Sequence, residues 1–109
     1  MGKTFAEMQA MYREVVQRFQ KIELREWNAE GAMIESSKQA GELAKQVMIK
    51  EKYYALENDV CDVDERLENE MADVIAQVMR LADFYKIDLE KVFIEAREDE
   101  DRYLKSRGV

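Results

Sequence analysis

Two segments of the chain carry acidic side chains at a spacing that can hold a hard metal ion. Residues 39–48 read QAGELAKQVM and residues 70–79 read EMADVIAQVM, so the second segment resembles the first position by position. The paired positions are Gln39 with Glu70 and Glu42 with Asp73, and three of these four residues are acids. Side chains three residues apart share one face of a helix, and carboxylate oxygens are the ligands that Mg²⁺ and Mn²⁺ prefer. The pattern indicates either an acidic metal site that lacks one charge at Gln39 or two similar helices whose acids face solvent.

The residues around Gln39 extend this pattern along one helix. Glu35, Gln39, Glu42 and Gln46 are spaced four, three and four residues apart, which places them within about 60° of one another on a helical wheel. Glu35 lies one turn before Gln39, so it is the natural acid to supply the charge that Gln39 lacks. Lys38 lies beside this stripe, where it either contacts a phosphate or is a solvated neighbour of the acids.

Composition excludes several classes of function. The 109 residues include no histidine, which removes Ser-His-Asp and Cys-His catalysis and every zinc site that uses histidine. The single cysteine, Cys61, cannot form an intrachain disulfide and indicates a reducing compartment. A net charge of −7 without a basic stripe argues against nucleic acid as a partner. We find no signal peptide and no apolar run near 18 residues, so we expect a cytoplasmic protein without a membrane partner.

Apolar residues recur at helical spacing through most of the chain. With no proline and four glycines, the sequence lacks the turn formers that an all-β fold requires. We therefore expect one all-α domain over residues 1–109, with helices at about 4–26, 30–53, 63–86 and 89–105. Several of the apolar stripes are wide, which predicts that a second copy of the chain covers part of them. The expected core positions are Phe5, Met8, Tyr12, Val15, Phe19 and Ile22, then Met33, Ala40, Leu43, Ala44 and Val47, then Leu67, Met71, Val74, Val78, Leu81 and Tyr85, and finally Leu89, Val92 and Phe93.

Local signals mark where these helices begin. A side-chain oxygen at the residue before a helix accepts a hydrogen bond from the first turn, and a glutamate three residues later can return the bond. Trp27 precedes the second helix, where its ring either stacks on a nucleotide base or packs between the first two helices. The expected caps are Thr4 with Glu7 and Asp62 with Glu65, both at capping-box spacing, together with Asn28 and Asp88.

Several short motifs occur in a characteristic order between residues 27 and 103. They are Trp27, Gly41-Glu42-Leu43-Ala44, the segment ENEMADVI at 68–75, Leu81-Ala82, Ile87-Asp88-Leu89-Glu90 and Arg102-Tyr103. This ordered set resembles the MazG-like branch of the all-α nucleoside triphosphate pyrophosphohydrolases. Any one of the motifs is weak, whereas the complete order is fairly specific.

The resemblance implies an enzyme that hydrolyses a nucleoside triphosphate to the monophosphate and pyrophosphate, as in the house-cleaning of nucleotide pools. It implies a four-helix-bundle fold completed by homo-oligomerisation, as a homodimer or a homotetramer. It also implies Mg²⁺, or Mn²⁺ in its place, held by Glu42, Glu70 and Asp73 as catalytic metal ligands. Along the last helix, the resemblance leaves Arg97 and Arg102 as candidates for binding the substrate phosphates.

The sequence departs from the family pattern at two places. Gln39 stands where the family has its first glutamate, and a glutamine oxygen can bind Mg²⁺ but carries no charge. In the last helix, Glu95 or Glu98 and then Asp99 stand where the family often has a lysine and an asparagine. These departures leave two alternatives open. One is a catalytically weakened homologue that acts as a nucleotide-binding or protein-interaction module, and the other is a helical assembly protein with no ligand.

Overall fold

The computed structural model of the chain describes residues 2–54 and 62–109. These residues form four helices and no strand, so the all-α prediction is confirmed. Cys61, from which we predicted a reducing compartment for the protein, lies outside the described residues. None of the helices in 2–54 and 62–109 is long and apolar enough to cross a membrane. The helices are α1 (Phe5–Phe19), α2 (Ala29–Lys50), α3 (Val63–Phe84) and α4 (Leu89–Ser106).

Three of the four predicted helix caps are confirmed. At α1 the capping box is complete, because the Glu7 amide donates to Thr4 Oγ1 at 3.1 Å and the Glu7 carboxylate accepts from the Thr4 amide at 3.1 Å. Asn28 Oδ1 accepts from the amide of residue 31 at 2.8 Å, and Asp88 Oδ1 accepts from the amide of residue 91 at 3.2 Å. The Ser/Thr/Asn/Asp signals therefore placed these helix starts within one residue.

The predicted capping box at Asp62 is wrong. Asp62 is the residue before α3, but its side chain makes no hydrogen bond to the first turn. Instead, Asp62 Oδ2 accepts a hydrogen bond from Arg66 Nε at 2.9 Å, one turn further along. A charged guanidinium donor is a stronger partner for a carboxylate than a neutral amide, so the side chain turns outward to Arg66.

The first helix ends earlier than the predicted residue 26. After Phe19 the chain tightens, with the Ile22 amide bonded to the Phe19 carbonyl at 2.9 Å. The following residue, Glu23, reaches α3 and accepts two hydrogen bonds from Arg80 Nη2 at 3.2 and 3.0 Å. If the helix continued, Glu23 would extend along the axis of α1 and would not reach Arg80. The Glu23–Arg80 ion pair therefore fixes the direction in which the chain leaves α1. Ile22, an expected core position, is consequently 76% exposed.

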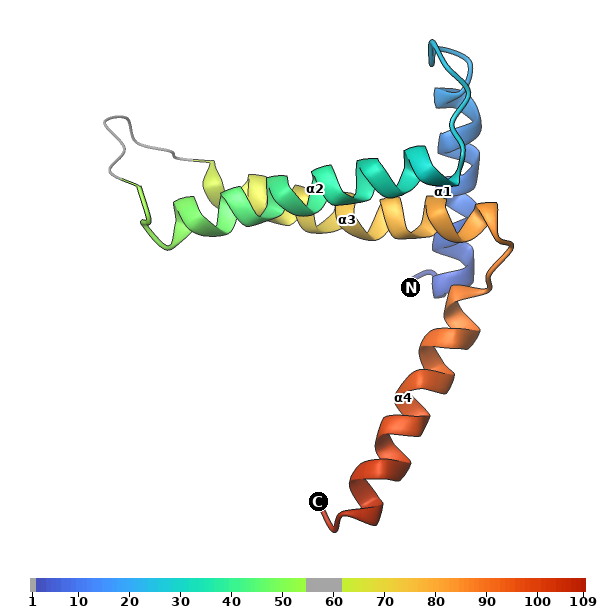
Figure 1. Cartoon of the computed structure of the whole chain (residues 1–109), viewed down its shortest axis with the longest axis vertical. Helices are drawn as coiled ribbons and strands as arrows, with labels where there is room; N and C mark the ends of the chain where they lie inside the picture. The colour runs from blue at the N-terminus through green and yellow to red at the C-terminus, as the bar shows by residue number, and fades with distance from the viewer. Residues whose placement is uncertain (1, 55–61) are drawn as a thin grey trace.

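The helices α2 and α3 lie side by side and antiparallel, α1 crosses one end of this pair, and α4 runs away from it (Figure 1). At the other end of the pair, Lys50 Nζ lies 2.5 Å from Asp64 Oδ1. We call the paired α2 and α3 the hairpin. The helix α4 contacts α1 near its own start, where the rings of Phe5 and Phe93 stack with centroids 6.4 Å apart, and it has no buried residue.

A tight corner separates α3 from α4, as the sequence predicted. Lys86 has a left-handed φ of 54°, and the Ile87 amide bonds to the Ala82 carbonyl at 3.0 Å. This bond from the third residue after Phe84 is part of the Schellman pattern, in which glycine usually occupies the left-handed position. Here lysine occupies that position, so the corner carries some backbone strain.

The orientation of the apolar stripes on the hairpin differs from the prediction. On α2, Met33 and Val47 were expected in the core but are 53% and 44% exposed. On α3, Met71, Val78 and Tyr85 are likewise exposed. The physical reason is that the hairpin helices are covered only where α2 and α3 face each other and where α1 crosses α3, and these covered positions include polar as well as apolar residues. The buried apolar residues within 2–54 and 62–109 are Val16, Ala32, Met79 and Ala82.

The chain is therefore open rather than compact. Its radius of gyration is 17.6 Å, against about 13 Å for a compact domain of this length. Its accessible surface is 8910 Å², against about 6,300 Å² for a compact monomer of this mass. Within one chain, the four helices do not close around a common core.

Candidate functional site

A row of polar side chains runs along the two helices of the hairpin, part-buried except for the buried Gln46 and Gln77 and the exposed Asp73. We call this row the polar seam, and it consists of Glu35, Gln39, Glu42 and Gln46 from α2 with Glu70, Asp73 and Gln77 from α3. Its register follows from the Lys50–Asp64 ion pair, because eight residues back from Lys50 is Glu42 and eight residues forward from Asp64 is residue 72. Glu42 and Glu70 therefore lie in the same part of the hairpin.

Three oxygen atoms of the seam are closed off from solvent and have no hydrogen-bond partner among the described residues. They are Glu70 Oε2, Gln46 Oε1 and Gln77 Oε1. Gln46 and Gln77 are both at least nine-tenths buried. A buried acceptor without a donor costs about 1–3 kcal/mol, and more when it is charged. The seam therefore presents acceptors that a cation or a bound water would satisfy.

Gln39 and Glu35 act together at one turn of α2. Gln39 Nε2 donates to Glu35 Oε1 at 2.9 Å, and Lys38 Nζ lies 3.7 Å from the same oxygen. The neutral amide thus orients the carboxylate one turn before it. That Glu35 replaces the missing charge stays a prediction. Lys38 is 65% exposed, so its pairing with Glu35 is weak.

The predicted metal ligands supply the right chemistry but are not gathered into a closed set. Across residues 2–54 and 62–109, no group of three or more His, Cys, Asp or Glu side chains is placed to hold a metal ion. Glu70 turns into the hairpin, whereas Asp73, one turn later, is exposed. The donor set is entirely carboxylate and amide oxygen, which fits Mg²⁺ or Mn²⁺ and not a softer metal.

Tyr12 of α1 belongs to this site, although the sequence analysis placed it in an apolar stripe. Its hydroxyl accepts a hydrogen bond from Gln77 Nε2 at 3.3 Å. Burial raises the pKa of this hydroxyl, the charge of Arg80 opposes that shift, and the charges of Asp73 and Glu35 add to it. The hydroxyl therefore lies within electrostatic reach of both helices of the seam. The available signal was that Tyr12 is the one residue of its stripe with a hydroxyl group.

A buried arginine borders the seam. Arg80 is 5% exposed, and its Nη2 donates to both carboxylate oxygens of Glu23 at 3.2 and 3.0 Å. Its guanidinium also lies 4.2 Å from the centroid of the Trp27 ring, in a cation–π contact. Trp27 therefore packs against α3, and it lines a cavity of about 410 Å³ together with Glu35 and Ile34. Base stacking on Trp27 stays a prediction.

The two arginines expected to bind phosphate lie elsewhere. Arg97 and Arg102 are on α4, which runs away from the hairpin (Figure 1). Arg97 Nη2 lies 2.7 Å from Glu100 Oε1, and Arg102 pairs with Asp99. Both cations are thus neutralised on their own helix, and the structure does not bring them to the seam of the same chain.

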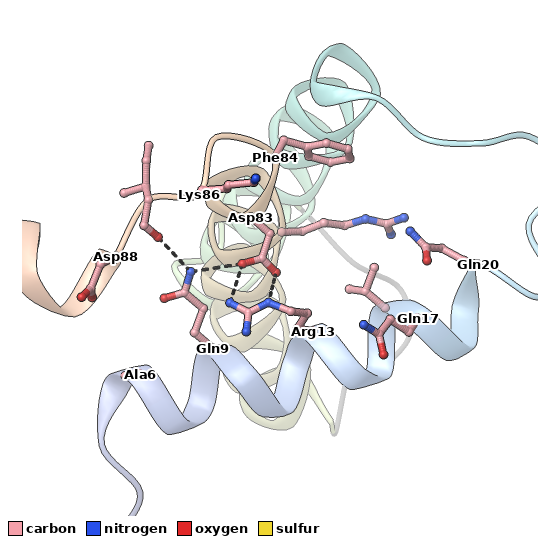
Figure 2. A pocket seen from close by; sticks show the side chains of 12 residues that line it. Ala6, Gln9, Arg13, Gln17, Gln20, Asp83, Phe84, Lys86 and Asp88 are labelled. Atoms are coloured by element: carbon pink, nitrogen blue, oxygen red, sulfur yellow. Dashed lines mark hydrogen bonds and ion pairs between the residues drawn. The ribbon is translucent and has the colours of Figure 1, made fainter.

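A larger cavity of about 690 Å³ lies between α1 and the end of α3 (Figure 2). Gln9 Nε2 donates to Asp83 Oδ1 at 3.3 Å and to the Ile87 carbonyl at 3.2 Å. Arg13 donates to both oxygens of Asp83, from Nε at 3.2 Å and from Nη2 at 2.8 Å. These bonds tie α1 to the α3–α4 corner, so the polar groups of this cavity mainly hold the fold.

The structure thus gathers Glu35, Gln39, Glu42 and Glu70 along one seam, with Asp73 at its edge. It adds Tyr12, leaves Lys38 exposed beside the seam, and keeps Arg97 and Arg102 apart from it. The arrangement leaves oxygen acceptors along the seam without a partner, but it does not close three acids of the described residues around one point. Comparison with protein-family models, with curated proteins and with solved structures finds no match to this chain.

Proposed function

We propose that this chain is a cytoplasmic, Mg²⁺-dependent nucleoside triphosphate pyrophosphohydrolase with a MazG-like fold, which releases the nucleoside monophosphate and pyrophosphate. The observation that carries the proposal is the Glu70 carboxylate, whose Oε2 is closed off from solvent and has no hydrogen-bond donor among the described residues. A carboxylate oxygen that is closed off from solvent and lacks a partner is unfavourable unless a cation or a bound water compensates it. Such a residue in the middle of an acidic seam supports cation binding.

We assign two roles to the seam residues, which are binding of the cation and acceptance of a proton. Glu42, Glu70 and Asp73 would hold the cation, which would neutralise phosphate charge and make water more acidic. Gln39 fixes Glu35 through Oε1, so Glu35 Oε2 is left to accept a proton from the water that attacks the α-phosphorus. Because the chain has no histidine, a carboxylate is the base that remains.

The exposed side of the hairpin supports a homodimer or a homotetramer. We call this side the hairpin face, and it consists of Met33 and Val47 on α2 with Met71, Ile75 and Val78 on α3. The chain exposes about 2,600 Å² more surface than a compact monomer of its mass. A typical interface buries about 800 Å² on each partner, so the excess is large enough for such an interface on this face and for further contacts between copies.

A charge on the hairpin face should separate the subunits. We expect Val78→Glu to convert the oligomer to a monomer, because the interface would bury an unpaired carboxylate. Sedimentation equilibrium at one fixed protein concentration measures the change. The matched control is Val109→Glu, which alters an exposed valine at the end of the chain. A wild-type monomer, or a Val78→Glu variant of unchanged mass, would contradict the proposal.

The activity is tested by pyrophosphate release from a panel of standard and modified nucleoside triphosphates. We expect release in the presence of Mg²⁺ or Mn²⁺ and none after the metal is removed with a chelator, because the seam acids need the cation to approach polyphosphate. Restoring Mg²⁺ should restore the rate. No release across the panel at any metal concentration would exclude the enzyme for those substrates.

A second candidate is a binding module with the same fold and little turnover. It is favoured by the Gln39 amide, which donates to Glu35 and adds no charge, and by Arg97 and Arg102, which are paired on α4. Such a module binds nucleotide without releasing pyrophosphate. A Gln39→Glu variant that creates activity would identify a site that has lost its fourth acid.

A further inference from the structure

The larger cavity, between α1 and the α3–α4 corner, has the size of a small-molecule site. Its volume is about 690 Å³, and such sites in proteins usually measure about 300–1,000 Å³. Figure 2 shows the Phe84 ring on one side of this cavity and the side-chain amides of Gln17 and Gln20 on the other. Phe84 and Ile87 are 40% and 41% exposed, so the chain leaves apolar surface uncovered here. The cavity therefore offers an apolar wall and hydrogen-bonding amides to the same ligand.

A buried arginine in the wall of the cavity is only partly compensated. Arg80 lines the cavity and is 5% exposed. Both of its hydrogen bonds to Glu23 come from Nη2, whereas its Nε is closed off from solvent and has no partner among the described residues. A buried donor without an acceptor is unfavourable, especially when it carries charge. A second anion on the cavity side would compensate the part of the guanidinium that Glu23 does not reach.

Lys86, at the corner, is a further positive charge in the lining of the cavity. The other charged residues of the lining are engaged, because Arg13 pairs with Asp83 and Asp88 accepts from the first turn of α4. Lys86 makes no ion pair within residues 2–54 and 62–109. The cavity therefore attracts an anion, although the chain as a whole carries a net charge of −7.

We propose that this cavity binds a small organic anion in which one carboxylate is joined to an aromatic ring. Arg80 receives the carboxylate, and the ring packs against Phe84 and Val16 on the apolar wall. Lys86 adds attraction on the corner side of the cavity. A single negative charge suits the site, because Glu23 already occupies one nitrogen of Arg80. The competing explanation is that solvent fills the cavity and that Arg80 serves only the fold.

This cavity is separate from the polar seam, because the two share no residue. Its ligand requires neither a metal ion nor a nucleotide, so the proposal goes beyond the proposed function and does not rest on it. The ligand would contact α1, α3 and the corner at once. Binding should therefore also raise the temperature at which the protein unfolds.

Benzoate is the probe, because it is a minimal aromatic carboxylate, and benzamide is its uncharged counterpart. The full-length protein is titrated with each compound while NMR spectra follow the Nε–H resonance of Arg80. We expect benzoate to shift this resonance and to bind at least about tenfold more tightly than benzamide, since a hydrogen bond to a charged group is gained. This measurement reports on Arg80 without a substitution that would destabilise the fold.

Two variants that keep Arg80 locate the binding. Lys86→Gln should weaken benzoate binding by about two- to fivefold, the usual effect of one exposed charge pair, and glutamine keeps a non-glycine residue at the φ of 54°. Phe84→Leu should weaken the binding of benzoate and benzamide alike, because it removes the ring from the apolar wall. The matched control is Lys91→Gln, an exposed lysine on α4 outside the cavity, which should change neither affinity.

The proposal is overturned if the wild type does not bind benzoate saturably, if benzamide binds equally well, or if benzoate leaves the Arg80 resonance unshifted. Unchanged benzoate affinity in Lys86→Gln or in Phe84→Leu would also overturn it, since the benzoate would then lie elsewhere on the chain. These results do not bear on the polar seam. A protein that binds benzoate in this cavity but releases no pyrophosphate refutes only the enzyme, whereas pyrophosphate release without benzoate binding refutes only the anion site.

Discussion

Replacing Glu70 by glutamine is expected to lower metal-dependent pyrophosphate release by at least about 100-fold, since even residues that merely orient a metal ligand cost about 10- to 100-fold. Glu70 Oε2 is buried and has no partner among the described residues. No described protein group therefore compensates the charge on this oxygen, whereas a bound cation would. Glutamine keeps the size of the side chain and removes that charge. The variant should therefore unfold at a temperature equal to or higher than the wild type while it loses activity.

The two readouts together make this test specific. Pyrophosphate release and Mg²⁺ affinity are measured beside thermal unfolding for Glu70→Gln and for the control Glu68→Gln, an exposed acid on the same helix. The control should behave as the wild type in all three measurements. Full activity in Glu70→Gln would show that Glu70 is not part of the site. A large loss of stability would show that Glu70 has a structural role.

Replacing Arg80 by methionine is expected to lower the free energy of unfolding by about 3–5 kcal/mol, the usual cost of breaking a buried ion pair from one side. The side chains of Arg80 and Glu23 are 6% and 16% exposed, so Glu23 would be left with little solvent to replace the guanidinium. The Trp27 ring would also lose its cation. Denaturant unfolding at fixed protein concentration measures the change.

Two variants separate the buried pair from a general effect of losing an arginine. Arg97→Met removes a similar ion pair and a similar contact with an aromatic ring, but on the exposed helix α4, so it should cost less than about 1 kcal/mol. Adding Glu23→Gln to Arg80→Met should recover part of the loss. A loss below about 1 kcal/mol in Arg80→Met would mean that the pair does not anchor the end of α1.

Local signals in the sequence predicted the four helices and most of their starts. The caps at Thr4, Asn28 and Asp88 depend only on residues within one turn, which is why spacing alone was sufficient. The acids of the seam were also found by spacing, since helical periodicity places residues 35, 39, 42 and 46 on one face whatever packs against it.

The parts that the sequence did not predict depend on contacts between distant residues. The end of α1 depends on Arg80, which is 57 residues from its partner Glu23. Tyr12 joins the seam through Gln77, 65 residues away, and its spacing among apolar residues gave no indication of this. Met33 and Val47 are apolar at core spacing, but which side of a helix is covered depends on its neighbours and not on its own pattern.

The isolation of α4 has a consequence for how this chain opens. Apart from its first turn, α4 is held by ion pairs within itself, such as Lys105 with Asp101. Most of the stability of a helix in a protein comes from tertiary packing, and α4 has no buried residue, so its amides should exchange with solvent through local opening while the hairpin stays folded. Trp27 fluorescence then reports unfolding of the hairpin alone, whereas total helicity also includes the melting of α4.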